Sequence, residues 1–85
     1  MIPYAIHYNR EATVAIYQIA RGIAGEITLA IRALAREPRP FKSFVIEEPP
    51  NTFVMKVSGY FITYAIDEDT HSIIIALIEQ SYSEE

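Results

Sequence analysis

The stretch MKVSGYFITYAID at Met55–Asp67, followed closely by SIIIALIE at Ser72–Glu79, decides the fold of this chain. Aromatic and β-branched residues recur in it at a period of two, which puts alternate side chains on opposite faces of a β-strand. Ser58-Gly59 and a short acidic segment interrupt the pattern. The region therefore predicts three consecutive strands joined by tight turns. The last strand is almost continuously aliphatic, so we expect it to be central and buried on both faces.

The segment from Asn9 to Pro38 predicts a helical hairpin. Asn9 suits the N-cap of a first helix, because its side-chain oxygen can accept a hydrogen bond from an amide of the first turn. Gly22 and Gly25 interrupt the helical spacing that follows, so we expect the chain to turn there into a second helix. Pro38 ends the second helix, because proline lacks the amide hydrogen that a helix interior needs. The apolar residues at helical spacing are Ala12, Ile16, Ile19, Ile23, Ile27, Ile31 and Leu34.

Strand-like alternation also occurs at Ile2–Tyr8, Phe41–Glu47 and Thr52–Val57. The predicted order of elements is therefore β-α-α-β-β-β-β. A helical hairpin must bury its apolar face, and the sheet is the partner that this chain offers. The sequence thus predicts a single α+β domain over residues 1–85, in which a mainly antiparallel sheet packs against a helical hairpin.

Composition excludes several classes of protein. The chain has 85 residues, no cysteine and a net charge of −4, which excludes a disulfide-stapled fold and argues against nonspecific binding to nucleic acid. Five basic residues between Arg21 and Lys42 leave room for one local phosphate-facing patch. The N-terminus does not read as a signal peptide, and the longest apolar run, Ile73–Ile78, is much shorter than a membrane span. We therefore expect a cytoplasmic protein that does not associate with a membrane.

No cluster of residues predicts a metal or a cofactor. His7 and His71 are the only histidines, and no carboxylate or second histidine accompanies either one at the spacing of metal ligands. Asp67, Glu68 and Asp69 lack the following glycine and distal glutamate of a calcium loop. We interpret these acidic residues as a solvated turn, His7 as a surface residue of its strand and His71 as a solvent-facing residue.

Three short motifs, in this order, resemble the RelE/ParE superfamily of toxins from bacterial toxin–antitoxin systems. Tyr4–Tyr8 is similar to the family's first strand, in which aromatic and aliphatic residues alternate. Ile31–Pro38 is similar to the end of its second helix, and Gly59–Tyr64 resembles its signature strand of the form Tyr-Arg-aliphatic-x-Tyr. The resemblance extends from about Tyr4 to Ile78, and it implies the same α+β fold.

The resemblance also implies a chemistry that this sequence carries only in part. RelE-type members are ribosome-dependent mRNA endonucleases, in which basic side chains stabilise the charge that builds on the scissile phosphate. ParE-type members act on DNA gyrase. In this sequence the signature arginine is Phe61, a second basic position is Val54, and Glu79-Gln80-Ser81 replaces a basic stretch after the last strand. We therefore expect the usual mRNA cleavage to be lost.

Four residues are the candidate carriers of any cleavage that remains. Lys56 matches a basic position of the family, and Arg39 and Lys42 follow the second helix. Tyr82 could take the place of a C-terminal tyrosine that some members of the family use. If cleavage is retained, the ribosome and its mRNA are the targets that the resemblance implies.

The resemblance implies a toxin-like component of a type II toxin–antitoxin system, with a cognate antitoxin as its partner and no cofactor. Two alternatives stay open. The first is a non-enzymatic interaction module on the same fold, acting as a decoy for an antitoxin or as a homodimer through an exposed sheet edge. The second is a ParE-like inhibitor of DNA gyrase.

Overall fold

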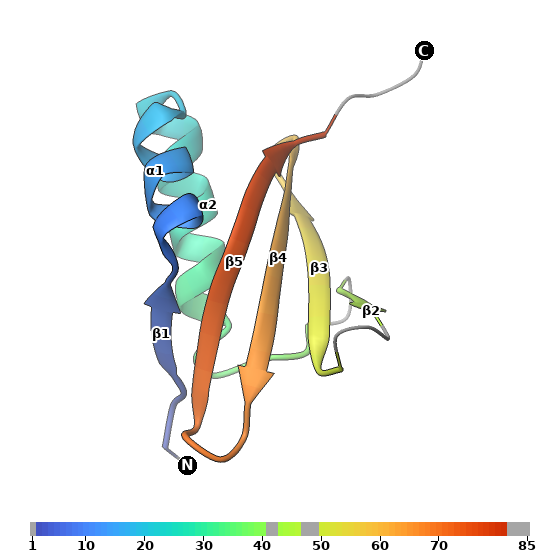
Figure 1. Ribbon diagram of the computed structural model, residues 1–85. Coiled ribbons are helices and arrows are strands. Elements are labelled where there is room, and N and C mark those ends of the chain that lie inside the picture. Colours follow the sequence, from blue (N-terminus) through green and yellow to red (C-terminus); the bar gives the residue numbers. More distant parts are fainter. Residues whose placement is uncertain (1, 41–42, 47–49, 82–85) are drawn as a thin grey trace.

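The computed structural model describes residues 2–40, 43–46 and 50–81. These residues form five strands and two helices in the predicted order, shown in Figure 1. The elements are β1 (Ala5–Tyr8), α1 (Arg10–Gln18), α2 (Arg21–Ala33), β2 (Phe44–Ile46), β3 (Thr52–Val57), β4 (Tyr60–Asp67) and β5 (Ser72–Gln80).

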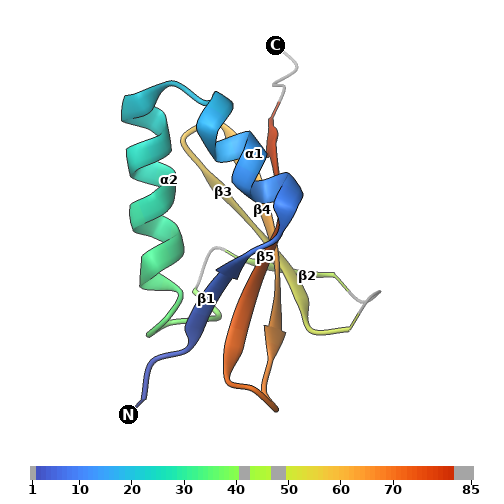
Figure 2. The same ribbon diagram turned by 60° about the vertical axis from the view of Figure 1, so that its left-hand side comes forward.

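The strands form one sheet in the order β1-β5-β4-β3-β2. β1 pairs with β5 in parallel, and all the other pairs are antiparallel. Both helices lie on the same face of this sheet, as the two views in Figures 1 and 2 show. The predicted fold class, a mainly antiparallel sheet packed against a helical hairpin, is confirmed. Among the described residues, no helix is long and apolar enough to cross a membrane.

The core lies between the helices and the sheet. β4 contributes every second residue to it, because alternate side chains of a strand point to the same face. β5 follows the same rule as far as Ile75, and a register shift opposite Thr63/Tyr64 then brings Ile78 to the core face. The buried apolar residues are Ala12, Ile27, Ile31, Leu34, Met55, Ile62, Tyr64, Ile66, Ile73, Ile75 and Ile78.

The turn between β3 and β4 forms as the sequence predicts. Ser58 and Gly59 both have positive φ angles, 51° and 85°. Such a pair is typical of the two-residue turns whose twist matches that of antiparallel strands. The Ser58 hydroxyl also donates a hydrogen bond to the carboxylate of Glu26, which ties this turn to α2.

The helical hairpin differs from the prediction in the place of its break. The predicted N-cap is confirmed, because the Ala12 amide donates a 2.9 Å hydrogen bond to the Asn9 side chain. α1, however, ends where Ile19 takes an extended conformation with ψ of 144°. Gly22 and Gly25 lie inside α2, since a glycine with an ordinary negative φ weakens a helix without interrupting it.

The strands differ from the prediction at their ends and in the burial of β5. β1 begins at Ala5 rather than Ile2, whose side chain is 77% exposed. β2 spans three residues of the predicted Phe41–Glu47, and both of those end residues lie outside the described residues. β5 is an interior strand, but it is not buried on both faces, because the helices cover only one of them. Leu77 is 36% exposed on the uncovered face.

Candidate functional site on the open face of the sheet

The sheet face that points away from the helices carries Phe61, which stands where the resemblance expects an arginine. We call the residues of β3, β4 and β5 that point this way the open face. Phe61 belongs to it, since it alternates with the buried Ile62 and Tyr64 of β4. The open face consists of Thr52, Val54, Lys56, Phe61, Thr63, Ala65, Asp67, Ser72, Ile74, Leu77 and Glu79.

Three of these residues form a row across the strands. Lys56 of β3 is the register partner of Phe61, and Phe61 is the register partner of Glu79 in β5. The Lys56 ammonium lies 5.7 Å from the centre of the Phe61 ring. This distance is within the range of a cation–π interaction, which contributes about 0.5–1 kcal/mol at an exposed site. Phe61 thus separates one positive and one negative side chain.

The charge on the open face does not suit a phosphate-binding cluster. Lys56 is its single Lys or Arg, and Glu79 carries the opposite charge two strands away. Electrostatic catalysis on a phosphate needs several preorganised cations or donors around the reacting group. Of the positions that the resemblance assigns to cations, the open face supplies only Lys56.

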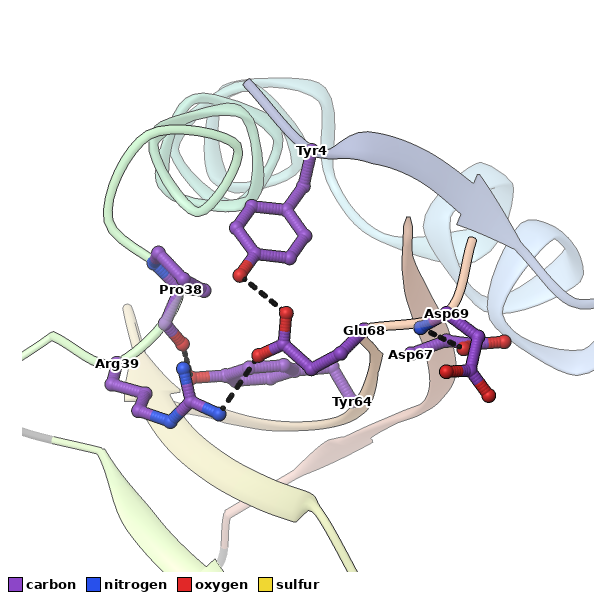
Figure 3. A network of polar contacts seen from close by, with 7 residues as sticks. All are labelled: Tyr4, Pro38, Arg39, Tyr64, Asp67, Glu68 and Asp69. Carbon is purple, nitrogen blue, oxygen red and sulfur yellow. Dashed lines mark hydrogen bonds and ion pairs between the residues drawn. The ribbon is translucent and has the colours of Figure 1, made fainter. Parts of the chain in front are cut away.

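Arg39 lies on the other side of the sheet from Lys56. Its guanidinium is 5.5 Å from the centre of the Phe53 ring, and Phe53 packs against the core on the helix side. Arg39 Nη2 also lies 3.2 Å from Glu68 Oε2, an ion pair drawn in Figure 3. The structure therefore does not bring Arg39 and Lys56 together. Lys42 and Tyr82 lie outside the described residues.

Glu68 joins three separate parts of the chain. The Tyr4 hydroxyl donates a 2.9 Å hydrogen bond to one of its oxygens, and Arg39 pairs with the other. Figure 3 shows Tyr4 and Arg39 each reaching a different oxygen of this carboxylate. The hydrogen bond from Tyr4, followed by that from Arg39, lowers the pKa of Glu68. The same contact with Glu68 raises the pKa of Tyr4.

Tyr64 and His71 extend this arrangement. The buried Tyr64 donates its hydroxyl to the Pro38 carbonyl at 2.9 Å, and burial raises the pKa of this tyrosine. His71 stacks on Tyr4 with ring centres 3.8 Å apart, and its Nε2 lies 2.7 Å from the Ile2 carbonyl oxygen. His71 is therefore partly buried by these contacts and less open to solvent than the sequence predicts. These contacts hold the N-terminal strand and the Pro38–Arg39 segment against the β4–β5 turn.

The acidic segment between β4 and β5 forms a turn, as the sequence predicts. Asp67 accepts hydrogen bonds from the amides of Asp69 and Thr70, which is the common role of an aspartate at the start of a turn. Among the described residues, no group of three histidine, cysteine, aspartate or glutamate side chains is placed to hold a metal ion. His7 is exposed on β1, as expected.

No pattern in the sequence indicates the contact between Tyr4 and Glu68. The two residues are 64 positions apart in the chain, and each was interpreted from its own strand or turn. Only the parallel pairing of β1 with β5 brings them together, because it places the start of β1 beside the β4–β5 turn.

The likeness of this chain to known proteins lies in its structure rather than in its sequence. No family model and no curated protein matches the sequence. The structure is similar to a chain of the RelBE2 toxin–antitoxin complex from Mycobacterium tuberculosis, with a TM-score of 0.79 and 20% identity over 93% of this chain and 99% of that chain. It is also similar to the isolated RelE toxin of E. coli, with a TM-score of 0.84 and 13% identity over 96% of this chain and 88% of that one.

A chain of the intact E. coli RelBE complex gives a similar result, with a TM-score of 0.82 and 12% identity over 94% of this chain and 99% of that chain. Each match covers nearly the whole length of both proteins. The chain therefore has the fold of RelE, in agreement with the resemblance that its motifs carry.

Proposed function

We propose that this chain is a toxin-like component of a type II toxin–antitoxin system, that it binds a cognate antitoxin, and that it lacks the usual ribosome-dependent mRNA cleavage. The RelE fold, shared over nearly the full length with structures of RelBE complexes, supports the first two parts. The third part rests on Phe61, which stands in the middle of the open face where the resemblance expects an arginine.

The missing cations should raise the barrier to cleavage so far that cleavage is lost rather than slowed. Removal of one preorganised donor from a charge-stabilising site typically raises the barrier by about 2.7–4 kcal/mol, or a hundredfold to a thousandfold in rate. Phe61 and Val54 both stand at positions where the resemblance expects cations, and Glu79 adds a negative charge beside Phe61. Effects of this size, acting together, would leave little catalysis above background.

If some cleavage persists, Lys56 is the strongest of its four candidate carriers. It is exposed on the open face, whereas Arg39 is engaged by Glu68 on the other side of the sheet. Lys42 and Tyr82 stay candidates on the sequence alone. A Lys56→Ala variant should then abolish the residual activity, while Arg39→Ala should leave it.

A non-enzymatic interaction module is the second candidate, and one observation favours it. The row of Lys56, Phe61 and Glu79 is electrically balanced and centred on an aromatic ring. Such a surface suits contact with a protein better than contact with a polyanion. In this case the chain binds the antitoxin without arresting growth.

Inducible expression in a bacterial host, with and without the small reading frame beside the gene, tests the proposal. We expect growth arrest that the neighbouring frame relieves, co-purification of its product, and intact mRNA in a translating extract. An Ile27→Asp variant controls for folding, because Ile27 is completely buried. Co-purification with normal growth would favour the interaction module. Normal growth in both cases without a complex would remove the toxin–antitoxin interpretation.

A further inference from the structure

β5 extends well beyond the strand that pairs with it. β1 accompanies β5 only over Ser72–Ile75, and the last contact is a 3.0 Å hydrogen bond from the Asn9 amide to the Ile75 carbonyl. β5 then continues to Gln80, as its long arrow in Figure 1 shows. In the part of the chain that the structure describes, no strand pairs with Ala76–Gln80 on this side. This half of β5 is therefore a sheet edge.

Helix α1 stands beside this edge and makes a groove with it. The groove is wide open to solvent and has a volume of about 540 Å³. Its lining includes Val14 of α1, which is 49% exposed, and it ends at Leu77 of β5, whose side chain points to the open face. We call it the α1/β5 groove, lined by Glu11, Val14, Ala15, Gln18, Leu77 and Ile78.

The unpaired edge favours a bound segment with an extended backbone. An exposed strand presents a row of amide and carbonyl groups that another extended chain can pair with. Alternate side chains of such an added strand would point toward α1, where Val14 and Ala15 offer an apolar wall. A helix in the groove would leave the backbone groups of β5 without partners.

The charges around the groove favour basic side chains in the segment that binds there. Arg10 also lines the groove, but Glu11 lines it too and Glu79 follows Ile78 in β5. Among the described residues, none of these three takes part in an ion pair. The whole chain carries a net charge of −4. A segment that combines apolar with basic side chains is therefore the complementary occupant.

The other edge of the sheet does not offer the same site. β2 is only three residues long, and prolines lie close to it in the sequence at Pro40, Pro49 and Pro50. Short edge strands and nearby prolines are features that discourage strand addition. Of the two sheet edges, the C-terminal half of β5 is therefore the one that suits the addition of a strand.

We propose that the α1/β5 groove binds an extended segment of the partner, rich in apolar and basic residues, which adds a strand to Ala76–Gln80. The proposal rests on the antitoxin partnership proposed above and names the chemistry of one of its contacts.

The test uses the purified full chain and a seven-residue peptide of alternating lysine and valine as the probe. We expect the peptide to slow hydrogen exchange and shift NMR amide signals within Ala76–Gln80, but not in β2. A Val14→Lys variant should bind it at least tenfold more weakly. A Leu29→Lys variant makes the same change of charge on α2, at a residue that is 64% exposed and outside the groove, and should bind within twofold of the original.

The outcomes separate this proposal from the function proposed above. A peptide methylated on every backbone nitrogen keeps its charge but cannot donate to a strand, so it should not bind. Equal binding of the methylated peptide, equal weakening by both lysine variants, or no change within Ala76–Gln80 would overturn the groove proposal. These measurements do not involve the antitoxin. If the peptide binds as expected but expression of the chain neither arrests growth nor yields a complex, the toxin–antitoxin role is wrong and the groove proposal still holds.

Discussion

Lys56 and Phe61 face each other across β3 and β4, with the Lys56 ammonium 5.7 Å from the centre of the Phe61 ring. On its other side Phe61 pairs in register with Glu79. The ring therefore occupies the position where an added cation would lie between an existing cation and an anion. This arrangement decides what a substitution at Phe61 can do.

Phe61→Arg alone should raise the affinity for single-stranded RNA by less than about threefold, because Glu79 is placed to pair with the new charge. The double variant Phe61→Arg, Glu79→Gln adds two units of positive charge and frees both cations. We expect it to bind a short RNA at least about tenfold more tightly, with a plot of log K against log salt steeper by about 1.4. Fluorescence anisotropy over a range of salt concentrations measures both quantities.

The matched control for this pair is Val45→Arg, Glu37→Gln. It changes the net charge by the same amount at two exposed positions that are not on the open face. An equal gain in the control would mean that total charge, rather than the open face, governs RNA binding.

Tyr64→Phe should destabilise the protein by about 0.5–1.5 kcal/mol, the usual contribution of one hydrogen bond. The variant keeps the buried ring but removes the hydroxyl that donates to the Pro38 carbonyl. Urea unfolding followed by circular dichroism measures the change. Tyr17→Phe is the control, because Tyr17 is 83% exposed and its hydroxyl makes no hydrogen bond within the described residues. Equal stability of the two variants would contradict a role for the Tyr64 contact.

The sequence was sufficient to predict the elements whose pattern is local. β3 has the bounds that were predicted for it, and β5 extends one residue beyond the predicted Ser72–Glu79. The residues of β3 and β4 alternate between the two faces of the sheet, and the Ser58-Gly59 turn between them leaves little freedom of register. The Asn9 cap is equally local, since donor and acceptor are three residues apart.

The sequence was insufficient where tertiary contacts decide. Leu77 is exposed although β5 is aliphatic over most of its length. Its exposure depends on which face of the sheet the helices cover, and the sequence of β5 does not determine that face. Arg39 and Lys56 both looked available for a phosphate. Their separation onto two sides of the sheet depends on Glu68, which comes within 3.2 Å of Arg39 only in the folded chain.

Gly22→Ala and Gly25→Ala should each stabilise the protein by about 0.5–1 kcal/mol, because alanine restricts the unfolded chain more than glycine does. Both glycines lie inside α2, and a methyl group added at either one meets no atom within 4 Å. Gly59→Ala should instead destabilise by about 1–2 kcal/mol, since its φ of 85° is unfavourable for alanine. Thermal and urea unfolding of the three variants measures the signs. A loss of stability at Gly22 or Gly25 would show that the helix there is not as described.

The contact between Tyr4 and Glu68 should make stability depend on pH in the acidic range. The hydrogen bond from Tyr4, with Arg39, holds the pKa of Glu68 below its ordinary value of 4.5. A carboxylate with a lowered pKa in the folded state stabilises the protein above the unfolded pKa, and this contribution is lost as the pH falls through the folded value. The urea midpoint of the original protein should therefore exceed that of Glu68→Gln at neutral pH, and the difference should shrink as the pH falls through the lowered pKa of Glu68. NMR titration of the Glu68 carboxyl carbon gives an independent measurement, in which Tyr4→Phe should raise the pKa of Glu68. An unchanged pKa in that variant would mean that Arg39 alone is responsible.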